Sequence, residues 1–155
     1  MPMMINPPAE LRSPADTVGG LVYFPRMLSK IRLQQAGRCP DDLKENLGLG
    51  FDAKCVRFLR ISYQDLCDRV RETAGKASDE DLLEWCYVHG RRPDDDEIEI
   101  WNTFMRKHGW KDKAVGILER RKRESGLEGR DDLETMFQYI DADESRPIRP
   151  PQGEE

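Results

Sequence analysis

The chain has 155 residues, of which 37% are hydrophobic and 35% are charged, and its formal net charge is −5. A chain of this length forms one domain that buries roughly two-thirds of its unfolded surface, and its composition excludes the apolar-poor pattern of disordered proteins. No segment approaches the ~18 apolar residues of a membrane span, and the first residues lack the basic and apolar regions of a signal peptide. The sequence therefore predicts a cytoplasmic, single-domain globular protein.

The predicted elements are helices. Apolar residues at helical spacing and helix-capping residues recur from about residue 20 to residue 143, whereas alternating strand-like runs are nearly absent. In chain order, the predicted helices occupy the regions 21–35, 51–59, 63–74, 79–89, 93–108, 111–125 and 131–143. We predict an all-α fold, a single compact bundle of about six to eight short helices over residues 18–143. An extended N-terminal segment (1–17) precedes this helical domain, and a loose C-terminal tail (144–155) follows it.

The first predicted helix raises two questions. Its apolar stripe comprises Leu21, Phe24, Leu28, Ile31 and Gln35. Pro25 either begins this helix or kinks it, because a proline inside a helix costs ~3 kcal/mol. The opposite face carries Tyr23, Arg26 and Lys30, which we interpret as a solvated polar face. The alternative is an anion site in which the two cations act together with the N–H groups of the helix entrance.

Helix boundaries explain most of the polar motifs that follow. Ser62 and Ser78 each precede an aspartate by three residues, as in a capping box, Pro93 begins the next helix, and Asp131 caps the last one. The two histidines, His89 and His108, each precede a helix-ending glycine, where a cation is favourable.

A capping role for both histidines leaves no convincing base for nucleophilic catalysis and no zinc site. The four cysteines, Cys39, Cys55, Cys67 and Cys86, lack the C-x-x-C spacing, so we expect free thiols. The sequence therefore predicts neither a metal nor a cofactor, and it assigns no catalytic residue.

Charge is distributed unevenly along the chain. Residues 1–77 carry +3 and residues 78–155 carry −8. Nucleic-acid binding gains most of its affinity by neutralising phosphates, so this balance argues against DNA or RNA as a partner. Residues 106–123 nevertheless have a local charge of +6, which we interpret as a solvated helix, with an RNA or acidic-partner surface as the alternative.

One acidic cluster, Asp141, Asp143 and Glu144, lies at a helix exit, where the helix dipole disfavours negative charge. We expect at least one of these carboxylates to form a partly buried pair with an arginine. The candidate partners are Arg91 and Arg92, or Arg12. A metal or catalytic role and a frayed, solvated end are the alternatives.

Six motifs carry a resemblance to a known family: "LRSP", "GGLVYFPRMLSKIRL", "NLGLGFD", "EWCYVHGRRP", "WNTFMRKHGW" and "YIDADESR". Together they resemble a family of small bacterial proteins catalogued only as a domain of unknown function, from about Leu11 to Arg146. The resemblance implies a single, mainly helical domain, and it gives no residue a role.

Two functions fit the sequence. The first is a non-enzymatic binding or protein-interaction module. The alternative is a small-molecule-binding protein or enzyme, with an anionic ligand held by arginine and lysine in a pocket between helices. The expected ligand-binding residues are Tyr23, Arg26, Lys30, Arg91, Arg92, Trp101 and Asn102. The expected partners are accordingly a protein or a small anion.

Overall fold

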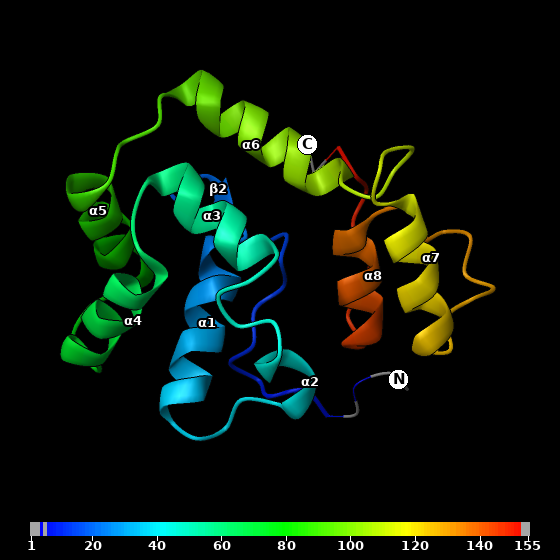
Figure 1. Ribbon diagram of the computed structural model, residues 1–155, viewed down its shortest axis with the longest axis horizontal. Coiled ribbons are helices and arrows are strands. Elements are labelled where there is room, and N and C mark those ends of the chain that lie inside the picture. The colour runs from blue at the N-terminus through cyan, green and yellow to red at the C-terminus, as the bar shows by residue number, and fades with distance from the viewer. Residues whose placement is uncertain (1–3, 5, 153–155) are drawn as a thin grey trace.

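The computed structural model describes residue 4 and residues 6–152. Within this part of the chain, the fold consists of eight short helices and one two-stranded antiparallel hairpin, which confirms the mainly helical fold (Figure 1). The elements are β1 (Thr17–Val18), β2 (Leu21–Val22), α1 (Phe24–Gln35), α2 (Asp41–Lys44), α3 (Phe51–Leu59), α4 (Tyr63–Glu72), α5 (Asp79–His89), α6 (Asp95–Lys107), α7 (Val115–Glu124) and α8 (Met136–Asp143).

The hairpin replaces the start of the first predicted helix. Gly19 and Gly20 both have positive φ, 56° and 78°, which a tight turn between two strands requires and which glycine adopts without strain. The glycine pair therefore forms a hairpin turn and not a helix entrance. Helix α1 begins at Phe24, with Pro25 in its first turn, so the proline begins the helix without kinking it.

Helix α1 lies at the centre of the molecule. Helices α4 and α5 pack against one side of it, α6 crosses the top, and α7 and α8 lie together on the other side (Figure 1). The main apolar core joins α1 and the hairpin to α3, α4, α5 and α6, while a second cluster joins α7 to α8. Nine of the twelve residues of α1 are consequently buried, including both of its cations near the N-terminal end.

Helix α6 holds the hairpin in place through two side chains. The Trp101 Nε1–H donates to the carbonyl oxygen of Val22 at 3.1 Å. The Asn102 amide accepts from the Val22 N–H at 3.0 Å and donates to the Gly20 carbonyl oxygen at 2.7 Å. Both residues are therefore structural braces of β2.

The helix boundaries agree in part with the capping predictions. Ser78 forms the expected capping box with Asp81. A second capping box joins Asp94 to Glu97, so α6 begins after Asp94 and not at Pro93. The last helix begins after Thr135, not Asp131, because the Thr135 hydroxyl accepts from the Gln138 N–H.

The basic stretch and the tail are more ordered than the sequence suggests. Lys122, expected in a solvated helix, is buried, and its ammonium lies 3.5 Å from the Leu133 carbonyl oxygen. In the segment expected to be a loose tail, Glu144 is buried and Arg149 is bonded to Asp16. The outermost parts of both predicted terminal segments, residues 1–3, 5 and 153–155, lie outside the described residues.

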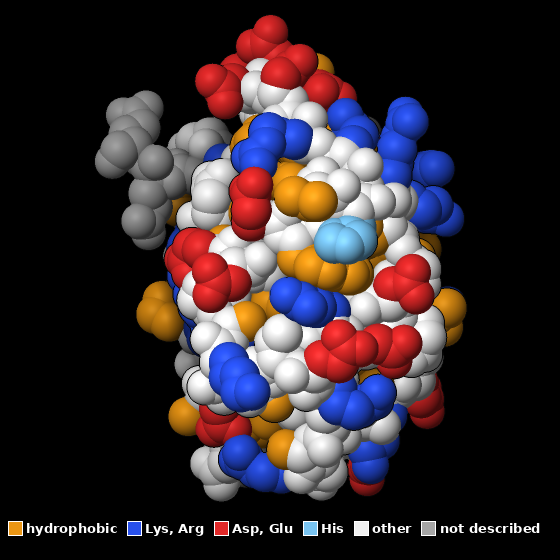
Figure 2. Space-filling view, turned by 90° about the vertical axis from the view of Figure 1, so that its left-hand side faces the viewer, with side chains coloured by type: hydrophobic (Ala, Val, Ile, Leu, Met, Phe, Trp, Pro, Cys, Tyr) orange, Lys and Arg blue, Asp and Glu red, His pale blue; other side chains and the backbone are white. Residues whose placement is uncertain are grey.

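The outer face formed by α4 and α5 is a mosaic of charges. Figure 2 shows acidic and basic side chains interspersed over it, with only small apolar areas between them. Among the described helices, none combines the length and apolarity needed to cross a membrane.

Candidate functional site

A cavity of about 330 Å³ lies between the α1 side of the molecule and the α7–α8 pair. Its apolar walls come from the 42–50 loop region, α3, α7 and α8: Leu43, Leu49, Phe51, Ala114, Ile117, Met136 and Ile140. This volume is at the lower end of the range for ligand pockets, about 300–1,000 Å³. We call it the central cavity.

The floor of the central cavity contains a buried ion pair between Arg26 and Glu144. Their side chains are 4% and 2% exposed, and two parallel hydrogen bonds of 2.8 Å join the guanidinium to the carboxylate. The Arg12 carbonyl oxygen accepts a further bond from Arg26 at 3.0 Å, and Arg146 also donates to Glu144. Burial raises the pKa of Glu144, but the two arginines outweigh it and the net pKa is lowered.

A second buried network joins Lys30, Asp52 and Tyr23. The Lys30 ammonium lies 2.8 Å from the Asp52 carboxylate and donates to the Tyr23 hydroxyl at 3.0 Å, and that hydroxyl donates to Asp52 at 2.6 Å. Asp52 is fully buried and also accepts from the Gly48 N–H. Burial lowers the pKa of Lys30, although Asp52 opposes this effect, and burial together with Asp52 raises the pKa of Tyr23.

Tyr23 adopts a strained backbone. Its φ is +77°, a value that side-chain-bearing residues rarely adopt and that costs about 1–3 kcal/mol. The strain positions the ring between Phe51 and Phe137 and directs the hydroxyl to the Lys30–Asp52 pair. The surrounding packing over-determines this conformation, so the floor of the central cavity is rigid.

Two buried polar atoms of the central cavity lack a hydrogen-bond partner among the described residues: His108 Nδ1 and Asp143 Oδ1. Asp112 lies 3.6 Å from His108 Nδ1, yet burial outweighs it and lowers the pKa of the imidazole. Burial and the neighbouring Glu144 raise the pKa of Asp143. A ligand donor could satisfy either atom, and an unsatisfied buried polar atom costs about 1–3 kcal/mol.

The expected pairing of the acidic cluster with arginine is confirmed, but with other partners. Glu144 pairs with Arg26 and Arg146, and Asp141 lies 3.5 Å from Arg146. The predicted partners lie elsewhere. Arg91 bonds Glu97 and Arg92 bonds Glu84, while Arg12 offers Glu144 no side-chain contact and bonds Asp16 instead.

Only part of the predicted ligand-binding set meets in one place. Tyr23, Arg26 and Lys30 line the central cavity together with Asp143 and Glu144. Their interpretation as a solvated face is wrong, because α1 is enclosed by the other helices and all three are buried. Arg91, Arg92, Trp101 and Asn102 lie outside the central cavity, in helix-end ion pairs and hairpin braces.

Sequence reasoning missed Asp52, His108, Ser125 and Tyr139 as residues of this region. Asp52 had a visible signal, since it lies in the first turn of α3 within the "GFD" motif and serves no capping role there. His108 was assigned to helix capping, whereas its imidazole packs against Phe51 and Phe104. Ser125 and Tyr139 bond each other at 2.5 Å across α7 and α8, a contact without a sequence signal.

The charged side chains on the floor of the central cavity are paired with one another. Each buried cation of the floor is paired with a buried carboxylate, and the other charged residues of the lining include both signs: Lys54 and Arg121, and Asp42, Glu124 and Asp143. The described residues contain no group of three or more His, Cys, Asp or Glu side chains placed to hold a metal ion. The geometry therefore fits an uncharged molecule with an apolar body and a hydrogen-bond donor.

Comparison with known proteins places the chain in a family. No curated protein matches the sequence significantly. A family model described as "Domain of unknown function (DUF5069)" matches residues 9–146, which includes every residue of the buried floor. Because the match covers most of the sequence, the chain belongs to the family described as Domain of unknown function DUF5069.

Proposed function

We propose that the protein is a non-enzymatic binding protein that holds a small, largely apolar molecule in the central cavity. The observation that carries the proposal is a preformed cavity with apolar walls over a rigid, charge-paired floor. Such concave, mainly apolar sites with a few polar groups are typical of small-molecule binding. The internal ion pairs support binding over catalysis, because the two buried cations, Arg26 and Lys30, are already paired with the carboxylates of Glu144 and Asp52.

The ligand we propose differs from the anion considered from sequence. An anion would compete with Glu144 for Arg26 and with Asp52 for Lys30, and both carboxylates are held by short contacts. A neutral ligand with an amine or hydroxyl group avoids that competition and can donate to Asp143 Oδ1 or His108 Nδ1.

The test uses 1-aminoanthracene, a neutral aromatic amine whose fluorescence rises in apolar surroundings. Ile117 lines the mouth of the central cavity and is 47% exposed, so Ile117→Trp narrows the entrance. Val115 lies on the same helix, is 39% exposed and is not part of the lining, so Val115→Trp is the matched control.

We expect saturable binding that Ile117→Trp weakens about tenfold or more and Val115→Trp leaves within about twofold. Absence of saturable binding, or equal effects of the two substitutions, would contradict the proposal.

We also propose a cytoplasmic location. All four cysteines are free, and three of them are buried. Unpaired thiols are typical of proteins in a reducing compartment. Fractionation of cells that produce the protein at its native level tests this, and recovery outside the cytoplasm would refute it.

A further inference from the structure

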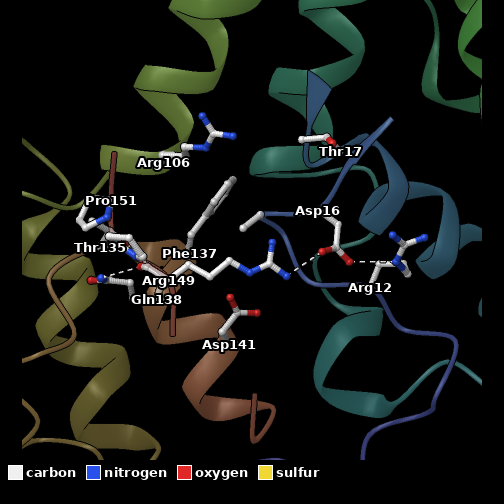
Figure 3. A pocket seen from close by; sticks show the side chains of 12 residues that line it. Arg12, Asp16, Thr17, Arg106, Thr135, Phe137, Gln138, Asp141, Arg149 and Pro151 are labelled. Carbon is white, nitrogen blue, oxygen red and sulfur yellow. Dashed lines mark hydrogen bonds and ion pairs between the residues drawn. The ribbon is translucent and has the colours of Figure 1, made fainter. Parts of the chain in front are cut away.

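A second cavity, separate from the central one, lies where the N-terminal segment, the end of α6, the start of α8 and the C-terminal segment meet (Figure 3). Its volume is about 360 Å³, and three arginines from three separate parts of the chain line it: Arg12, Arg106 and Arg149. We call it the arginine notch. We propose that it binds a small oxyanion, a phosphate ester or a carboxylate.

Two of the arginines are held in place by one carboxylate. Asp16 accepts from Arg149 at 2.8 Å and from Arg12 at 2.9 Å, as the dashed lines in Figure 3 show. Burial raises the pKa of Asp16, but the two guanidinium groups outweigh it and the net pKa is lowered. Asp16 therefore joins the two arginines, whose side chains are 45% (Arg12) and 37% (Arg149) exposed, and Arg12 also lies 3.8 Å from the Asp79 carboxylate.

The third arginine, unlike the other two, is not paired with a carboxylate in the part of the chain that the structure describes. Arg106 is half-buried at the end of α6, and it forms no hydrogen bond or ion pair with any other described residue. A guanidinium has five N–H donors, and a partly desolvated one without a partner is unfavourable. In Figure 3 its side chain lies above Phe137, which is also part of the lining. An oxyanion here would accept the charge-assisted bonds that Arg106 lacks.

The remaining wall favours the same ligand. Thr135 is the N-cap of α8 and Gln138 lies in its first turn, and the dipole of the helix places partial positive charge at this end. Gln138 also donates to the Arg149 carbonyl oxygen at 3.0 Å, which fixes the C-terminal segment against the helix.

The opposing charge in the arginine notch is Asp141, which is 2% exposed and has one carboxylate oxygen without a hydrogen bond. Burial raises the pKa of Asp141. Three arginines and two carboxylates, Asp16 and Asp141, line the arginine notch.

The test is isothermal titration calorimetry at low ionic strength with pyrophosphate and with citrate as probes. Arg106→Gln removes the unoccupied guanidinium. Lys107→Gln is the matched control, because it makes the same change in net charge at the next residue, which is exposed and outside the arginine notch. We expect saturable binding of at least one probe, weakened about tenfold or more by Arg106→Gln and less than about twofold by Lys107→Gln.

The two probes separate the ligand classes, since the tighter one identifies a phosphate or a carboxylate preference. Equal weakening by both substitutions would show non-specific charge attraction and overturn the proposal. Absence of saturable binding of both probes up to about 10 mM would also overturn it. Circular dichroism of each variant ensures that a loss of binding does not reflect unfolding.

Discussion

Removing the Glu144 carboxylate tests whether the buried ion pair organises the floor of the central cavity. Glu144→Ala leaves the Arg26 guanidinium, with its side chain only 4% exposed, without its two carboxylate hydrogen bonds. Only the Arg12 carbonyl oxygen remains as a partner of its Nη1 atom. Stranding a buried charge in this way costs about 3–5 kcal/mol of the free energy of unfolding.

The neighbouring residue provides the control. Asp143→Ala removes a carboxylate of the same cluster that has one unpartnered oxygen and whose pKa is raised by burial. We expect this substitution to change the free energy of unfolding by about 1 kcal/mol or less, because no buried cation depends on Asp143. The structure thus assigns the large loss to Glu144 within the "DADES" motif.

Urea unfolding followed by circular dichroism measures both variants, with the slope of the transition checked for constancy. The double variant Arg26→Met/Glu144→Met replaces the whole pair with apolar side chains of similar length and should recover most of the loss. The reasoning is refuted if Glu144→Ala costs less than about 1 kcal/mol, or if Asp143→Ala costs more than Glu144→Ala.

Three further predictions concern pH, packing and thiols. The pKa of Glu144 is lowered, so the stability that its carboxylate provides is lost as pH falls below 4.5, the usual pKa of a glutamate. The pKa of Asp143 is raised, so the stability that its protonated form provides is lost as pH rises. The wild type should therefore gain free energy of unfolding relative to Asp143→Asn as pH falls from 7 towards 3.8, the usual pKa of an aspartate, and it should lose stability below about 4 as Glu144 is protonated. A difference between the two proteins that stays constant with pH would contradict this. Gly90→Ala should lower the free energy of unfolding by about 3 kcal/mol, because the new Cβ would lie 1.9 Å from the Leu59 carbonyl oxygen at the end of α3. Gly116→Ala, which faces open space on α7, should raise the free energy of unfolding by ~0.5–1 kcal/mol. Similar unfolding midpoints for the two variants would refute this prediction. Cys67 is the one cysteine that is not buried, so it should react first when the folded protein is titrated with a thiol reagent in the absence of reductant. Four thiols should react after denaturation, and fewer than four would indicate a disulfide or another modification.

Local signals predicted every described helix except α2 (Asp41–Lys44), because most of these helices carry boundary residues and an apolar face of their own. Capping boxes at Ser78 and Asp94 satisfy the first N–H groups, and apolar residues at helical spacing define the buried faces. The hairpin at residues 17–22 could not be predicted in the same way. Its strands have two residues each, too few for an alternating pattern, and they depend on braces from Trp101 and Asn102, about 80 residues away in the sequence.

The candidate site was predictable only in its parts. The sequence showed that Tyr23, Arg26 and Lys30 share one helix face and that Glu144 breaks the helix-dipole rule. It could not show that these observations belong together, because Arg26 and Glu144 are 118 residues apart and meet only when α8 packs beside α1. Other elements cover the N-terminal part of α1 and bury even its polar face there, and amphipathic spacing alone does not reveal that environment.

The central claim is that the central cavity admits a small apolar molecule, and methyl-detected NMR with 1-aminoanthracene tests it most directly. Shift changes should concentrate on the methyl groups of Leu43, Ile117 and Ile140, which line the central cavity, and should leave Val88, 70% exposed on α5, unchanged. Saturation of the three lining residues with one common dissociation constant is the predicted result. Unshifted lining methyl groups, or equal changes at Val88, would contradict the account.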